Sequence, residues 1–326
     1  WEELEAAGHE TLVVSRAKDV TETLLDEIGI PYVSGSKGPR SSWLGQGVEL
    51  VSRDLRLYRL GRRFRPDVVL TRNPAGVHAA RALRVPSIFD TDNGTSAGIH
   101  FRLAEPWATV TTTPEGIGED YGPRHRQYPS YKSMAFLHPR RFTPDPSVRA
   151  DLGVGPEERF FLLRFVAMNA SHDHGHEGVP HDAAREMLAE LETRGKVFVS
   201  AEGDMPADLD RHRLPTKASQ FLDVLAEASL IVGDSGSVAA EAALLGTLSI
   251  FYSSFAGKLS YLNELEDDYG LVRNLTPPDT ASLTAAVEEL STPEAEATAA
   301  GGRAAMLDDK IDLTEWYLTL IDEVVS

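Results

Sequence analysis

Cysteine is absent from this 326-residue chain, and basic residues are scarce relative to acidic ones. Without cysteine the chain has no disulfide, thiolate metal site or cysteine nucleophile, a composition that fits a cytoplasmic protein. Its 32 Lys and Arg against 50 Asp and Glu give a net charge of -18. Such a charge repels polyphosphates and argues against general nucleic-acid binding. A binding site for an anion must therefore depend on groups close to it and not on the overall charge of the chain.

Long hydrophobic runs are also missing, because no apolar stretch approaches the ~20 residues that span a bilayer. The composition, 42% hydrophobic and 25% charged, is that of a globular protein, and the length suits two domains of ~150 residues. We therefore expect a cytoplasmic protein. Residues 50–66 have leucines at helical spacing and an arginine-rich far side, which would dock on the inner face of a membrane or simply be solvated.

The first residues, WEELEAAGHETLVVS, have the pattern of a helix end, a cap at Gly8 and a strand over residues 10–14. This is the second half of a βαβ unit. A helix needs a sheet face on which to bury its apolar stripe. We therefore expect a strand and the start of that helix to precede Trp1.

Beyond residue 14, short β-branched runs alternate with amphipathic segments in both halves of the chain. This alternation predicts an α/β fold with parallel sheets covered by helices. The periodicity stops between Pro129 and Pro146, where prolines, aromatic residues and basic residues are concentrated. We predict two Rossmann-like domains, over residues 1–129 and 147–326, which face each other across a cleft and are joined by a linker over residues 130–146.

The most informative segment is residues 229–252, SLIVGDSGSVAAEAALLGTLSIFY. An apolar strand runs into a short polar turn that opens a helix, and the turn consists of Gly233, Asp234, Ser235, Gly236 and Ser237. Free N–H groups and the positive end of the helix dipole would make this turn a seat for a diphosphate. Glu241, about one turn along the helix, would accept the hydroxyls of a ribose. The alternative is that Ser235 is only an N-cap and Glu241 a solvated helix residue.

This segment resembles the donor-binding motif of GT-B nucleotide-sugar enzymes. It is similar to the D-S-G-G-x-x-x-E-A stretch of UDP-N-acetylglucosamine 2-epimerases and to the equivalent helix of the lipid II-forming N-acetylglucosaminyltransferase. Nearly the whole chain resembles an uncharacterised archaeal and bacterial family related to both, through EAALLGT, YKSMAFLHPRRFTPD and RFVAMNASHDHGHEG.

The resemblance implies a GT-B fold, with an acceptor domain first and a nucleotide-sugar donor domain second. By it, Ser235, Gly236 and Ser237 would hold the diphosphate and Glu241 the ribose. It also implies neither a bound metal nor a cofactor, since the nucleotide sugar is a substrate.

A histidine-rich loop lies within residues 162–182, LLRFVAMNASHDHGHEGVPHD, after the first strand of the second domain. Arg164 would pair with a phosphate, and His172 or Asp173 would serve in acid–base chemistry. A zinc site is the alternative, with His172, His174, His176, His181 and Asp173 as ligands. Neither a helix nor a strand fixes their geometry, so the pattern favours no metal.

Two carboxylates follow a strand of the first domain in residues 89–101, FDTDNGTSAGIHF. Asp90 and Asp92 would lie at the carboxyl edge of the sheet, and Asp92 is our candidate for a general base or an acceptor-binding group. The alternative is turn chemistry, since Asp, Asn and Gly bend chains for local reasons.

Two basic clusters complete the set of candidates. Lys132, with His138, Arg140 and Arg141, lies in the linker and would contact a phosphate. Lys37 and Arg40 lie in a glycine-rich loop that would form an acceptor flap.

Three functions remain open. The first is a GT-B glycosyltransferase that moves a sugar from a nucleotide donor, UDP by resemblance, to an unidentified glycan or lipid-linked acceptor. The second is a UDP-N-acetylglucosamine 2-epimerase-like enzyme, although its carboxylates and histidine have no position-by-position match here. The third is a nucleotide-sugar-binding or envelope-assembly protein without catalysis.

Overall fold

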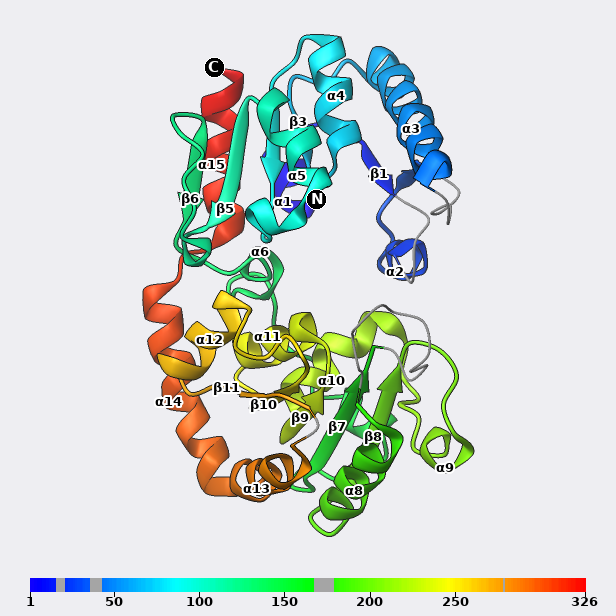
Figure 1. Ribbon diagram of the computed structural model, residues 1–326, viewed down its shortest axis with the longest axis vertical. Coiled ribbons are helices and arrows are strands. Elements are labelled where there is room, and N and C mark those ends of the chain that lie inside the picture. The colour runs from blue at the N-terminus through cyan, green and yellow to red at the C-terminus, as the bar shows by residue number, and fades with distance from the viewer. Residues whose placement is uncertain (16–20, 36–42, 167–178, 278) are drawn as a thin grey trace. The chain divides into compact units, whose positions relative to one another are not determined.

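The computed structural model describes residues 1–15, 21–35, 43–166, 179–277 and 279–326 (Figure 1). Its contacts divide the chain into two compact units. Unit 1 comprises Trp1–Lys132 and Ile311–Ser326, and unit 2 comprises Ser133–Lys310. No helix of the described residues is long and apolar enough to cross a membrane.

Unit 1 contains two parallel sheets. The larger has the order β3-β4-β5-β6, and β1 pairs with β2 in the smaller. The strands are β1 (Val13–Ser15), β2 (Tyr32–Ser34), β3 (Val69–Thr71), β4 (Ser87–Asp90), β5 (Val110–Pro114) and β6 (His125–Tyr128). The helices are α1 (Glu2–Ala6), α2 (Thr21–Ile28), α3 (Trp43–Phe64), α4 (Pro74–Leu83), α5 (Ile99–Ala104) and α15 (Leu313–Val325).

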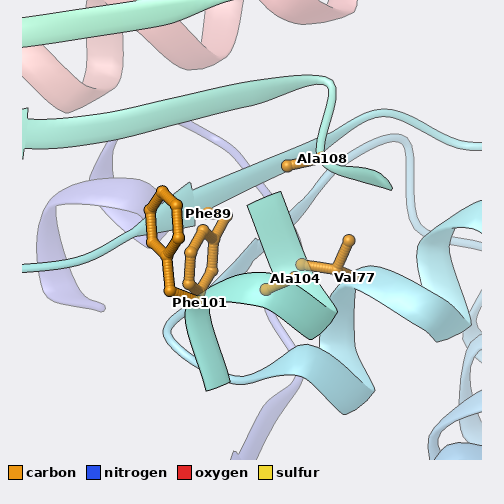
Figure 2. Packing of buried hydrophobic residues seen from close by; sticks show 5 residues of the cluster. All are labelled: Val77, Phe89, Phe101, Ala104 and Ala108. Atoms are coloured by element: carbon orange, nitrogen blue, oxygen red, sulfur yellow. The ribbon is translucent and has the colours of Figure 1, made fainter. Parts of the chain in front are cut away.

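Side chains of β4 pack against helices on both faces of the larger sheet. Successive side chains of a strand point to opposite faces. Phe89 packs with residues of α4, α5 and the segment that follows α5, in the cluster of Figure 2, which consists of Val77, Phe89, Phe101, Ala104 and Ala108. Its neighbour Ile88 instead packs with Val110 and with Leu320 and Ile321 of α15. The last helix of the chain therefore completes the core of unit 1.

Unit 2 contains one five-stranded parallel sheet of order β11-β10-β9-β7-β8. Its strands are β7 (Phe160–Phe165), β8 (Lys196–Ala201), β9 (Leu230–Gly233), β10 (Ser249–Tyr252) and β11 (Val272–Leu275). Its helices are α6 (Met134–Leu137), α7 (Val148–Asp151), α8 (His181–Glu192), α9 (Ala207–Asp210), α10 (Phe221–Glu227), α11 (Gly236–Leu245), α12 (Ser260–Asp267), α13 (Thr280–Leu290) and α14 (Pro293–Asp309). The strand order reverses between β7 and β9, and ligands of open α/β sheets bind at the carboxyl ends of strands at such a point.

The end of the chain belongs to a different unit from the one that its position in the sequence indicates. We predicted a single C-terminal domain over residues 147–326, whereas the contacts place Ile311–Ser326 in unit 1. Two hydrogen bonds hold the first residue of this C-terminal segment in unit 1. The Ile311 N–H donates to the Pro129 carbonyl at 3.2 Å, and the Ser130 hydroxyl donates to the Ile311 carbonyl at 2.8 Å. The α/β class and the parallel sheets are confirmed.

Candidate functional site

The N-terminus of α11 lies at the carboxyl end of β9, where the strand order of unit 2 reverses. The Ser235 hydroxyl accepts the Val238 N–H at 3.4 Å, so Ser235 is the N-cap of α11. Among the described residues no acceptor takes the N–H of Gly236 or Ser237. Ser237 is exposed. Two N–H groups and the positive end of a ten-residue helix are thus available to an anion.

Both glycines of the turn lie close to neighbouring atoms. A Cβ atom at Gly233 would lie 2.0 Å from the Arg164 carbonyl oxygen, so only glycine allows β9 to approach β7 this closely. A Cβ at Gly236 would lie 2.9 Å from the Tyr261 hydroxyl and 3.1 Å from a methyl carbon of Leu259. Gly236 therefore makes room for these side chains as well as leaving its N–H open.

Asp234 ties the turn to the end of β7. Its carboxylate accepts the Val166 N–H at 2.7 Å, and its own N–H donates to the Arg164 carbonyl at 3.2 Å. Burial raises the pKa of Asp234, against the lowering effect of backbone N–H donors and of the Arg164 charge. The side chain therefore acts as an acceptor that shapes the turn.

The Arg164 side chain already has interaction partners within unit 2. Its guanidinium donates to the Ser200 hydroxyl at 2.8 Å, forms an ion pair with Glu202 and lies 5.6 Å from the Phe221 ring centroid. Its Nε atom is buried and has no hydrogen-bond partner in the described part of the chain. To bind a phosphate, Arg164 would have to exchange Glu202, whose side chain is about half exposed, for the ligand.

A second polar cluster lies at the carboxyl edge of the larger sheet of unit 1. Asp90 ends β4, and its Oδ1 atom accepts hydrogen bonds from three hydroxyls: Tyr317 at 2.6 Å, Thr112 at 3.1 Å and Tyr128 at 3.3 Å. The Arg72 Nε atom lies 3.4 Å from Asp90 Oδ2. Burial, followed by the Asp90 charge, raises the pKa values of Tyr128 and Tyr317, so both remain donors to this carboxylate.

Asp92 continues this cluster toward the surface. Arg72 pairs with it from one side, and the Lys132 ammonium lies 3.0 Å from its Oδ2 atom. Burial tends to raise the pKa of Asp92, but the charges of Arg72 and Lys132 outweigh burial and hold the pKa below its ordinary value. The carboxylate therefore stays ionised at neutral pH and accepts a proton poorly. Lys132, which we placed in the linker as a phosphate ligand, is bound to Asp92 within unit 1.

The remaining candidates contribute less to either cluster. His172 and Asp173 lie outside the described residues, as do Lys37, Arg40 and most of the proposed zinc ligands. Glu241 is half-buried on α11. No group of three or more potential metal ligands occurs within the described ranges.

Sequence reasoning did not identify the partners of the two aspartates. Arg72 directly follows β3, as Asp92 closely follows β4, so the common carboxyl edge of parallel strands was a usable signal. Tyr317 has no such signal, because it reaches Asp90 from a helix 227 residues further along the chain.

The comparisons with known proteins identify the fold. Neither a protein-family model nor a curated protein sequence matches the chain. Among solved structures, the spinosyn forosaminyltransferase SpnP is similar at a TM-score of 0.63 and 16% identity, over 99% of this chain and 93% of that one. A glycosyltransferase from Rickettsia africae is similar at a TM-score of 0.60 and 12% identity, over 100% of this chain and 93% of that one. The UDP-GlcNAc 2-epimerase of Neisseria meningitidis, bound to UDP-GlcNAc, is similar at a TM-score of 0.63 and 13% identity, over 91% of this chain and 88% of that one.

These similarities extend over the whole chain. The protein has the fold of GT-B glycosyltransferases and UDP-GlcNAc 2-epimerases, as its sequence predicted. The structural neighbours include the glycosyltransferase VinC, solved in complex with dTDP, besides the Neisseria epimerase bound to UDP-GlcNAc.

Proposed function

We propose that the protein is a GT-B glycosyltransferase that moves a sugar from a nucleotide donor, UDP by resemblance, to a glycan or lipid-linked acceptor. The observation that carries this proposal is the N-terminus of α11, where two N–H groups have no acceptor among the described residues at the carboxyl end of β9. The strand order of unit 2 reverses at this point, where ligands of open α/β sheets bind. The fold of nucleotide-sugar enzymes supports it.

The proposed chemistry is stabilisation of a leaving diphosphate. As the bond between sugar and phosphate breaks, negative charge develops on the phosphate oxygens, and the Gly236 and Ser237 N–H groups with the helix dipole stabilise it. This arrangement supplies its donors from the backbone and calls for no resident cofactor. Glu241, further along α11, is the proposed partner of the ribose hydroxyls.

On the acceptor side, the lowered pKa of Asp92 favours a binding role over a catalytic one. Asp92 fixes Arg72 and Lys132 at the carboxyl edge of the unit 1 sheet, where each cation is partly exposed. We propose that this edge contacts the acceptor. Removal of the acceptor proton is assigned to His172 or Asp173, which follow β7 in the sequence.

The donor site is tested by calorimetric titration of the full-length protein with UDP, GDP, dTDP and UDP-N-acetylglucosamine. The informative variant is Ser237→Glu, because a carboxylate in the first turn favours the helix by about 0.3–1 kcal/mol but repels a diphosphate. We expect one nucleotide to bind the native protein and to bind Ser237→Glu at least about 100-fold more weakly.

The matched control is Ala281→Glu, which adds the same charge at the second, exposed position of α13. It should leave nucleotide affinity unchanged. Failure of every nucleotide to bind, in both low and molar salt, would contradict the proposal, as would equal affinity of the Ser237→Glu variant and the native protein.

An epimerase is the second candidate, because UDP-GlcNAc 2-epimerases match the fold as well as the transferases do, at TM-scores of 0.61, 0.63 and 0.60. Both reactions would use the same nucleotide seat. Incubation with UDP-N-acetylglucosamine alone separates them. Epimerised sugar nucleotide formed without any acceptor supports the epimerase, whereas turnover that depends on an added acceptor supports the transferase.

A further inference from the structure

Helix α3 carries a basic face that has no counter-charge among the side chains that the structure describes. No Asp or Glu occurs between Asp54 and Asp67, a stretch that holds five arginines. Four of them, Arg56, Arg59, Arg62 and Arg63, lie on the helix, are exposed and form no ion pair or hydrogen bond with the described residues. In unit 2, by contrast, exposed arginines such as Arg185 and Arg213 pair with carboxylates.

The opposite side of α3 packs against α4 in unit 1. Figure 1 shows α3 beside α4. The Asp54 carboxylate faces α4, 3.0 Å from His78 Nδ1, and Arg53 donates to the Asn73 side chain at the start of α4. A Cβ atom at Gly61 would lie 2.3 Å from a methyl carbon of Leu83, so the two helices are in close contact. The Asp54 carboxylate thus faces α4, where His78 lies, and not the exposed arginines.

Two aliphatic side chains lie on the exposed face with the arginines. Val51 is 58% exposed and Leu55 is 49% exposed. Residues 51, 55, 59 and 62 follow one another at helical spacing, so the aliphatic and guanidinium groups form one stripe. The face therefore combines positive charge with exposed apolar surface.

We propose that this face, defined by Val51, Leu55, Arg56, Arg59, Arg62 and Arg63, docks on an anionic lipid bilayer. The guanidinium groups would bind lipid phosphates, and the two aliphatic side chains would enter the boundary between headgroups and acyl chains. The strongly negative remainder of the molecule would be repelled by the same surface. Attraction confined to one helix therefore gives a defined orientation of unit 1 on the bilayer.

The lipid surface fits this face better than other polyanions do. A nucleic acid or an acidic glycan would use the arginines but would leave Val51 and Leu55 in water. An acidic patch on a second copy of the chain would likewise have no use for them. The combination of cationic and aliphatic side chains on one stripe is the pattern of helices that lie in a membrane interface.

The test is co-sedimentation of the full-length protein with vesicles of equal parts phosphatidylglycerol and phosphatidylcholine, compared with vesicles of phosphatidylcholine alone. The variant Arg59→Gln/Arg62→Gln/Arg63→Gln should lower partitioning onto the anionic vesicles about 100-fold, since each arginine near the surface contributes about a factor of five. Molar salt should have the same effect on the native protein. Leu55→Ala should weaken partitioning about tenfold.

The matched control is Arg185→Gln/Arg211→Gln/Arg213→Gln, which removes the same charge from exposed positions of unit 2. It should partition like the native protein. The proposal is overturned if the α3 variant partitions like the native protein, or if the native protein binds both kinds of vesicle equally. It is also overturned if the native protein ignores vesicles and the α3 arginines are needed instead for binding duplex DNA or for self-association, measured by sedimentation velocity. Each outcome is independent of nucleotide binding by unit 2.

Discussion

Asp90 and Asp92 show how two similar side chains acquire different tasks within three residues. Asp90 is buried and holds the sheet edge to α15 through the Tyr317 hydroxyl. Asp92 lies nearer to solvent and holds two cations in place. A buried carboxylate that loses its donors is costly, so Asp90 serves the fold, whereas the cations held by Asp92 remain within reach of a ligand.

Replacing Asp92 by Asn should destabilise unit 1 by about 1 kcal/mol at pH 7, because Lys132 loses its partner and Arg72 one of two, while solvent screens both partly exposed cations. The folded-state pKa of Asp92 is lowered from 3.8, so its stabilising contribution is complete above that pH. As the pH falls from 3.8 through the lower folded-state pKa, the carboxylate of the folded protein is protonated and the contribution disappears.

The measurement is urea unfolding followed by tryptophan fluorescence, which reports on unit 1 because Trp1, Trp43, Trp107 and Trp316 all belong to it. The difference between native protein and Asp92→Asn should be constant from pH 7 to pH 5 and shrink below pH 4. Asp204→Asn, at an exposed position of unit 2, is the control and should show no difference. A difference independent of pH would contradict the assignment.

At the scale of secondary-structure elements, α15 is the clearest case of a helix whose place is set by packing. Leu320 and Ile321 are buried against Ile88 and Val110, and Asp312 caps the helix by accepting the Thr314 N–H at 3.1 Å. Leu320→Ala should therefore destabilise unit 1 by about 2–4 kcal/mol.

Tryptophan fluorescence in urea again gives the measurement for α15. Val325→Ala, at an exposed position of the same helix, should change the free energy of unfolding of unit 1 by less than about 0.5 kcal/mol. Equal effects of the two substitutions would show that α15 does not complete the core of unit 1.

Elements with strong local signals were predicted well from the sequence. The strand at residues 230–233 and the helix that follows it were expected, because an apolar run ends in a glycine and serine turn. Strand β11 (Val272–Leu275) was missed, since it is short and carries polar Arg273 and Asn274. The sequence pattern of α15 indicates that one face of the helix is buried but not which sheet buries it. Only the structure shows that α15 packs in unit 1.

At the scale of the whole molecule, repeated alternation of strands and helices was sufficient to predict the fold, since each βαβ unit has local signals and parallel strands place their carboxyl ends at one edge. The same rule placed the α11 turn and the two aspartates at sheet edges. It could not predict which cations and hydroxyls converge on Asp90 and Asp92. Those partners are Arg72, which follows β3, side chains of β5, β6 and α15, and Lys132, and their meeting depends on the tertiary fold.

The central claim is that a nucleoside diphosphate binds at the N-terminus of α11. The most direct measurement is the amide nitrogen and proton NMR spectrum of the ¹⁵N-labelled protein during titration with UDP. The account predicts that the Gly236 and Ser237 amide protons shift strongly downfield as their N–H groups donate to phosphate oxygens. The account is contradicted if saturating UDP leaves these two amides unchanged, whether or not amides elsewhere in the chain respond.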